Sequence, residues 1–173
     1  VLGMNDTSIG LSDAQKSRVA IGHFNGQELP TWNMSNPIVP GGAIHSTVSD
    51  MLKFLAANMG LIKTKLDNAM QESHLIRHST GFVLPNNLQA SVDTKDQIYV
   101  GLGWFISTNF GHEIIWHNGA AVSGYNAFMA FNPITERGMV ILCSAALENI
   151  KINDISFNQK NKLNYLIWNL LNK

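Results

Sequence analysis

The sequence has little cysteine, little charge and no long apolar run, and each shortage excludes a class of protein. Its 173 residues include one cysteine, Cys143, so no internal disulfide can form. Twelve basic residues balance twelve acidic ones, which leaves no net field to attract nucleic acid or an anionic membrane. The longest uncharged apolar runs, such as residues 139–147, fall short of the ~20 residues that a transmembrane helix needs. We therefore expect no nucleic-acid partner and no transmembrane segment.

The composition that is present is that of a globular domain. Hydrophobic residues make up 45% of the chain and charged residues 14%, enough for one domain with a sizeable core. Cys143 lies in an apolar run, where a small buried side chain is the simpler reading than a reactive thiol. His74 and His78 have a spacing that can bind zinc, but no third ligand is placed beside them. We expect no metal and no other cofactor.

Three apolar runs in the second half of the chain predict an antiparallel meander. They cover residues 112–117, 124–132 and 137–145, with a turn at 132–136. In the middle run both alternating sets are mostly apolar, which places that strand inside a larger sheet. The segment 118–124 contains glycines and small residues, so we expect a loop whose backbone N–H groups can approach a ligand.

The remaining elements complete an α/β chain of the α+β type, with an antiparallel sheet flanked by helices. Asn25-Gly26 predicts a hairpin between residues 17–24 and 28–32. Ser46 or Thr47 caps a helix that Gly60 ends. The other expected elements are a more polar helix over 64–76, a loop over 77–97, a strand over 99–108 and an amphipathic closing helix over 158–172.

Four sequence blocks, taken in order, resemble one known family. They are Leu2-Gly3-Met4-Asn5-Asp6-Thr7, residues 41–51 (GGAIHSTVSDM), residues 99–104 (YVGLGW), and His117-Asn118-Gly119 followed by Gly124-Tyr125 and Phe131-Asn132-Pro133. The chain is similar to the C-terminal half of the class C β-lactamase and penicillin-binding serine hydrolases. This resemblance implies the C-terminal part of the β-lactamase/transpeptidase-like fold. It also implies that residues 1–173 form a single C-terminal fragment of a β-lactamase-like domain.

In that family three motifs meet in one cleft, and this sequence holds only one of them. Ser-x-x-Lys supplies the nucleophile, Tyr-x-Asn helps to move the proton, and Lys-Thr-Gly or His-x-Gly lies on an inner strand. No serine here has a lysine three positions on, and no tyrosine has an asparagine two positions on. Ser49 and Lys53 are one residue too far apart. The resemblance therefore implies that the nucleophile lies before Val1, in an N-terminal part of a parent chain that would be this chain's partner.

The third motif is matched by His117, Asn118 and Gly119. By resemblance, His117 has a catalytic role, Asn118 and Gly119 bind substrate, and Ala120 supplies a backbone N–H to the oxyanion hole. Imidazole titrates near neutral pH whereas lysine is a permanent cation there, so recognition of a substrate carboxylate is weakened. Ala146 lies near the position where class C enzymes have an asparagine that recognises the substrate carboxylate. The four tryptophans are expected in the core or at interfaces, with Trp104 near the floor of the cleft.

Two functions stay open on this basis. In the first, the chain is part of a serine hydrolase that uses acyl-enzyme chemistry on a β-lactam, peptide or ester carbonyl, and it is inactive alone. In the second, it is a catalytically silent binding or scaffold module. Without the N-terminal part of the domain, the sheet would have unpaired strand edges, and such edges favour a homodimer. The resemblance alone implies a periplasmic or secreted location.

Overall fold

The fold is built around a six-stranded antiparallel sheet. The computed structural model describes residues 1–30, 41–83, 97–109, 112–121, 123–145, 151–152, 155–156 and 169–172. The strand order is β3-β4-β5-β6-β7-β8, so each strand pairs with the next one along the chain. The strands are β3 (His78–Val83), β4 (Gln97–Val100), β5 (Phe105–Asn109), β6 (His112–Ala121), β7 (Tyr125–Asn132) and β8 (Arg137–Cys143). The expected α+β class and the meander of β6, β7 and β8 are confirmed.

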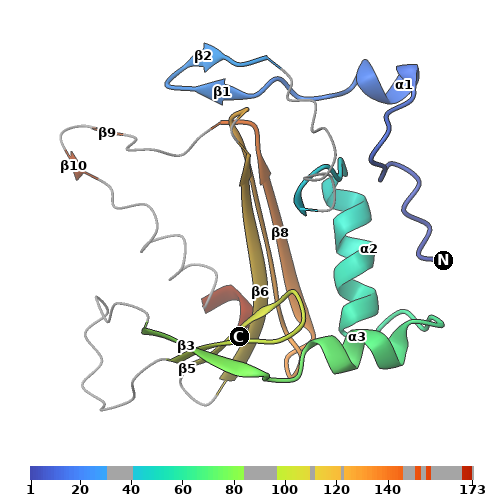
Figure 1. The fold of residues 1–173 in the computed structure, drawn as a ribbon, viewed down its shortest axis with the longest axis vertical. Helices are drawn as coiled ribbons and strands as arrows, with labels where there is room; N and C mark the ends of the chain where they lie inside the picture. Colours follow the sequence, from blue (N-terminus) through green and yellow to red (C-terminus); the bar gives the residue numbers. More distant parts are fainter. Residues whose placement is uncertain are drawn as a thin grey trace.

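Side chains of the sheet pack into two apolar clusters on its opposite faces. One cluster joins Ile115 and Phe131 to Leu55 of helix α2 (Val48–Asn58). The other joins Ile114 and Ala130 to Leu171 near the C-terminus. Successive strand residues point to opposite faces, which is why neighbouring residues enter different clusters. Figure 1 shows α2 along one side of the long strands and the C-terminal helical turn on the other. The interior position predicted for the middle strand is therefore confirmed.

Helix α2 begins and ends where the sequence predicts. The Thr47 Oγ1 accepts a hydrogen bond from the N–H of Asp50 at 3.3 Å, which caps the first turn. The last helical residue is Asn58, Met59 is the C-cap, and Gly60 follows with a φ of 77°. Helix α3 (Asp67–Ser73) is shorter than the predicted 64–76: the N–H of Thr64 donates to the Oδ1 of Asp67 in a turn before it, and the buried His74 is its C-cap. A short helix α1 (Asp13–Lys16) was not predicted.

The predicted hairpin turn is confirmed, but its strands are short. Strands β1 (His23–Phe24) and β2 (Gln27–Glu28) flank Asn25 and Gly26, which have φ values of 50° and 80°. The backbone N–H of His23 donates to the carbonyl of Ser144 at 2.7 Å, so the hairpin is attached beyond the end of β8. Strands β9 (Lys151–Ile152) and β10 (Ile155–Ser156) form a separate two-stranded pair.

Two of the expected elements are wrong in their boundaries. The strand expected over 99–108 is two strands, β4 and β5, joined by a turn in which Gly103 has a φ of 79°. The loop expected over 77–97 begins with β3, which pairs with β4 despite its low apolar content. Of the expected closing helix, residues 169–171 are helical. Residues 158–168 and 84–96, Ala146, Trp32 and Trp168 lie outside the described residues.

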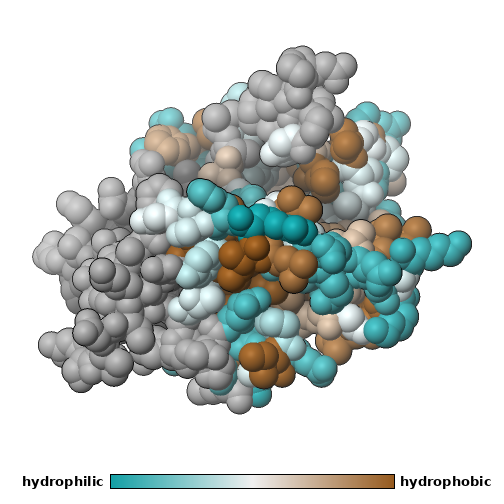
Figure 2. All heavy atoms as spheres, turned by 60° about the horizontal axis from the view of Figure 1, so that its bottom comes forward, coloured by the Kyte–Doolittle hydropathy of each residue, from teal (hydrophilic) through white to brown (hydrophobic). Residues whose placement is uncertain are grey.

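The described surface is mixed in character. Large apolar side chains remain exposed after α3 and at the β4–β5 turn, including Leu75, Ile76 and Leu102. Figure 2 shows apolar groups bordered by hydrophilic side chains on the face that carries α3. Cys143 is only half-buried, and its thiol donates to the carbonyl of Ala145 at 3.4 Å. None of the described helices has the length and apolar content needed to cross a membrane.

Candidate active site

The second half of β6 carries all four predicted site residues, His117 to Ala120, along one open strand edge. On one side β7 pairs with β6 as far as Ala121. On the other side β5 pairs with β6 only as far as Trp116. Within the described ranges no strand pairs with residues 117–121 on that second side. Asn118, Gly119 and Ala120 are exposed there. A strand edge of this kind can accept an extended ligand by backbone hydrogen bonding.

The loop expected from Asn118 is wrong, because β6 continues to Ala121. Small residues do not prevent a strand when a long partner is available, and β7 offers one whose residues pair without a break. The chain reverses only after this point, through Ser123 and Gly124, which has a φ of 81°. The site residues are therefore held by a sheet and not by a loop, which makes their spacing rigid.

The imidazole of His117 is held by ring stacking at the start of this edge. It lies over Phe105 of β5, with ring centroids 5.6 Å apart and an interplanar angle of 28°. Phe105 in turn stacks on Trp116 at 4.8 Å. No sequence pattern marks Phe105 as a site residue, because only the cross-strand register of β5 and β6 brings it beside His117.

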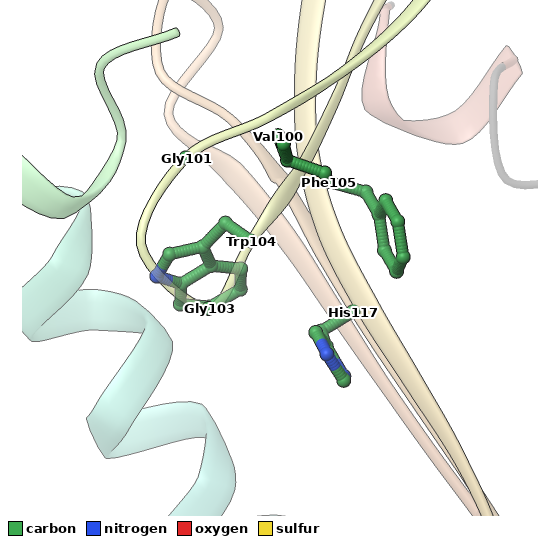
Figure 3. A pocket seen from close by; sticks show the side chains of 6 residues that line it. All are labelled: Val100, Gly101, Gly103, Trp104, Phe105 and His117. Carbon is green, nitrogen blue, oxygen red and sulfur yellow. The ribbon is translucent and has the colours of Figure 1, made fainter. Parts of the chain in front are cut away.

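His117 also borders an open hollow of about 120 Å³. Its other lining residues are Val100, Gly101, Gly103, Trp104 and Phe105. Figure 3 shows Trp104, Phe105 and His117 arranged around this space. We call it the His117 hollow. The expected position of Trp104 at the floor of a concavity agrees with this geometry.

The turn before Trp104 is fixed by a close contact with α3. A Cβ on Gly101 would lie 2.3 Å from the carbonyl oxygen of Ser73, so no larger residue fits without movement. The N–H of Leu102 donates to that same carbonyl at 2.9 Å. The N–H of Gly101 donates to the carbonyl of Trp104, also at 2.9 Å. These contacts set the direction in which Trp104 leaves the turn.

Trp104 is supported by a buried polar pair. Its indole packs edge-on against His74, and the Nε2 of His74 donates to the Oδ1 of Asn58 at 2.9 Å. The Nδ2 of Asn58 donates to the carbonyl of Phe54, which fixes the orientation of the amide. Burial lowers the pKa of His74 to about 4, so this histidine is neutral at physiological pH.

The candidate zinc pair does not form a site in the parts of the chain that the structure describes. His74 lies in the core with its Nε2 bonded to Asn58, whereas His78 is exposed on β3. No group of three His, Cys, Asp or Glu side chains in these parts could hold a metal ion. The arrangement is therefore an open strand edge next to a half-buried imidazole and an apolar hollow. A strand edge of this kind can hold an extended ligand, but these 173 residues contain no Ser-x-x-Lys nucleophile.

Comparison with solved structures identifies the class of fold. A β-lactamase/D-alanine carboxypeptidase from Pseudomonas syringae has a TM-score of 0.73 at 16% identity, covering 97% of this chain and 49% of that one. A D-alanine carboxypeptidase AmpC from Burkholderia cenocepacia has a TM-score of 0.67 at 19% identity, covering 85% and 48%. A class C β-lactamase in complex with cefoxitin has a TM-score of 0.70 at 20% identity, covering 97% and 49%. These likenesses establish the β-lactamase/transpeptidase-like fold.

The family follows from the sequence itself. The beta-lactamase family model matches residues 1–151. The chain belongs to the beta-lactamase family. It spans about half the length of the solved structures that it matches. None of the curated proteins matches it.

Proposed function

We propose that this chain supplies the substrate-binding strand of a serine hydrolase that uses acyl-enzyme chemistry on a β-lactam, peptide or ester carbonyl. The observation that carries the proposal is the open edge of β6 at residues 117–120, next to the half-buried imidazole of His117. In this proposal Asn118 and Gly119 bind the substrate backbone, and the N–H of Ala120 stabilises the oxyanion. Such a donor is most effective when a rigid element holds it before the reaction starts.

The proposed reaction needs two groups that these 173 residues lack. Acyl transfer requires an activated nucleophile and a group that moves its proton. The sequence contains neither Ser-x-x-Lys nor Tyr-x-Asn. The proposal therefore assigns both groups to an N-terminal part of a longer parent chain, which would face the β6 edge. A periplasmic or secreted location belongs to the same proposal and rests on the family resemblance.

A direct test measures turnover with and without the missing groups. We expect this chain alone to give no steady hydrolysis of nitrocefin or p-nitrophenyl acetate, and no covalent labelling by a fluorescent penicillin. Joined to the polypeptide encoded immediately upstream of Val1, it should be labelled and should hydrolyse at least one of these substrates.

A matched pair of variants then tests the site. In the joined protein, His117→Ala should lower kcat/KM by roughly a hundredfold, the scale of a lost proton-transfer group. His45→Ala, which removes an imidazole that contacts the carbonyl of Ala43 and does not line the hollow, should leave kcat/KM within about twofold. Steady turnover by the isolated chain, lost on His117→Ala, would refute the assignment of the nucleophile.

The absence of both catalytic motifs from this sequence also favours a second function, a catalytically silent binding or scaffold module. The coding sequence before Val1 separates the two. Ser-x-x-Lys and Tyr-x-Asn in that region support the hydrolase, and their absence supports the silent module.

A further inference from the structure

The His117 hollow has a composition that selects for an uncharged group. Val100, Trp104 and Phe105 provide apolar walls, and Gly101 and Gly103 leave the space between them open. None of the six lining residues is a lysine, an arginine, an aspartate or a glutamate. A carboxylate that entered the hollow would lose hydration without meeting a permanent cation, which is unfavourable. A neutral apolar group pays no such penalty.

Two basic side chains, one on α2 and one between α3 and β3, are already paired. Lys53 bonds to Asp50 at 2.8 Å, and Arg77 bonds to Glu72 at 3.1 Å. None of the described residues that line the hollow is a lysine or an arginine. His117 stands at the position where a β-lactamase of the resembled family has a lysine.

The size of the hollow limits what can enter it. Its volume is about 120 Å³. An enclosed apolar cavity of ~150 Å³ in another protein binds benzene, whereas this hollow is open to solvent, so it can hold at most one six-membered ring or a short branched alkyl group against its walls. A fused bicyclic group would extend beyond it.

The walls of the hollow are fixed before any ligand binds. The Phe105 ring stacks on both His117 and Trp116. Trp104 packs against Phe54, with ring centroids 6.1 Å apart, and against Phe131, with centroids 5.6 Å apart. Trp104 is only 6% exposed. Side chains that are already ordered lose little entropy on binding, which favours a planar ring placed among them.

We propose that the His117 hollow is a specificity subsite that accepts a neutral aryl or branched alkyl group of the acyl substrate and rejects a carboxylate at the same position. The inference rests on the proposed function, because it places the substrate along the β6 edge beside His117. It narrows the substrate class to uncharged esters and amides that carry a single ring or a short branched chain next to the reacting carbonyl.

The test compares two ligands that share one ring and differ in charge. Methyl phenylacetate and phenylacetate are titrated separately into the isotope-labelled 173-residue chain at pH 7.5, and the indole resonance of Trp104 and the ring resonances of His117 are followed by NMR. Trp104→Phe identifies the indole resonance. Methyl phenylacetate should shift both sets saturably, and phenylacetate should bind at least about tenfold more weakly, because its charge has no counterion.

Two variants that each replace a histidine by lysine, one inside the hollow and one outside it, test whether the lack of a cation in the hollow sets this preference. His117→Lys should reverse the order, so that phenylacetate binds about tenfold more tightly than methyl phenylacetate. His45→Lys adds the same charge outside the hollow and should leave the wild-type order unchanged. Circular dichroism of both variants checks that they fold.

Equal affinity for the two ligands, saturation without shifts at Trp104, or an unchanged order in His117→Lys would overturn the inference. Binding in this assay requires no nucleophile, so its outcome is separate from that of the turnover test. If the chain binds methyl phenylacetate but the joined protein shows no turnover, only the proposed hydrolase function is contradicted.

Discussion

The imidazole of His74 meets the indole of Trp104 edge to face, with ring centroids 5.6 Å apart and an interplanar angle of 78°. His74 comes from the end of α3, and Trp104 comes from the turn between β4 and β5. Behind them, Asn58 of α2 accepts the hydrogen bond from His74. One wall of the His117 hollow thus rests on a buried polar pair, so conditions that change the charge of His74 should also disturb Trp104.

The first prediction concerns the pH dependence of folding. Burial lowers the pKa of His74 from 6.5 to about 4. Between these two pH values the His74 imidazole binds a proton in the unfolded chain but stays neutral in the folded chain. The stabilising contribution is complete above pH 6.5 and is lost as the pH falls toward 4. We expect His74 to reduce the free energy of unfolding by up to about 1.4 kcal/mol per pH unit in this window.

Urea unfolding of the wild type and of His74→Gln between pH 7 and pH 4.5 measures this effect. The glutamine keeps an amide that can bond to Asn58 but cannot titrate, so its stability should fall less steeply. Asp50 stays charged in this window, because the hydrogen bond from Lys53 holds its pKa below 3.8. Burial raises the pKa of Glu113, but it titrates in both proteins and cancels in the comparison. Equal slopes in the two proteins would contradict the prediction.

The second prediction concerns Gly101. The variant Gly101→Ala places a methyl group 2.3 Å from the carbonyl oxygen of Ser73, so the turn must move away from α3. We expect a loss of about 2 kcal/mol in the free energy of unfolding, and a change in tryptophan emission as Trp104 shifts. In Gly10→Ala the new methyl group meets nothing within 4 Å, and stability should change by less than about 0.5 kcal/mol. A Gly101→Ala protein as stable as this control would show that the turn is not constrained.

The third prediction concerns the start of α2. Thr47→Ala removes the oxygen that accepts from the N–H of Asp50, and should cost about 1 kcal/mol of unfolding free energy. Ser49→Ala, two residues into the same helix, removes a hydroxyl that does not cap it, so its effect should be within about 0.5 kcal/mol. Thermal melts followed at 222 nm compare the two. If both variants melt alike, the cap contributes nothing measurable.

The fourth prediction concerns association of the chain. Among the described strands β8 lies at one end of the sheet, and its Leu142 is 40% exposed. An edge strand with an exposed apolar side chain can pair with a second copy, so we expect a homodimer in light scattering. Leu142→Lys should shift the population toward monomer. Ile134→Lys, in the β7–β8 turn at 71% exposure, adds the same charge away from the edge and should leave the dimer intact. A monomeric wild type at high concentration would argue against association through this edge.

Local patterns predicted much of the fold. The Asn25-Gly26 turn, the Thr47 cap and the stop at Gly60 each depend on a few adjacent residues, and the structure has all three. The meander was predicted from three successive apolar runs and the turn at 132–136. Strand β3 was missed because its residues HSTGFV have no clear alternation, and their strand conformation depends on pairing with β4.

The sequence predicted which residues form the candidate site, but it did not predict how their backbone is arranged. The resemblance selected His117 to Ala120, and the structure places all four on one strand edge. Their catalytic and binding roles stay predictions. A loop was expected there because Gly119 and its small neighbours have weak strand preference. Pairing with the long β7 outweighs this preference, since each added pair satisfies backbone groups that would otherwise be unpaired.

The sequence by itself determined the family, the turns, the caps and the absence of a Ser-x-x-Lys nucleophile from these 173 residues. Those features depend on residue identity and on neighbours a few positions away. Only the tertiary structure decided that β5 pairs with β6 no further than Trp116 and so leaves the next residues of β6 with an open edge. It alone decided that Phe105 stacks on His117, and that His74 is buried enough to stay neutral. The physical reason is that strand register and desolvation depend on contacts between residues far apart in the chain.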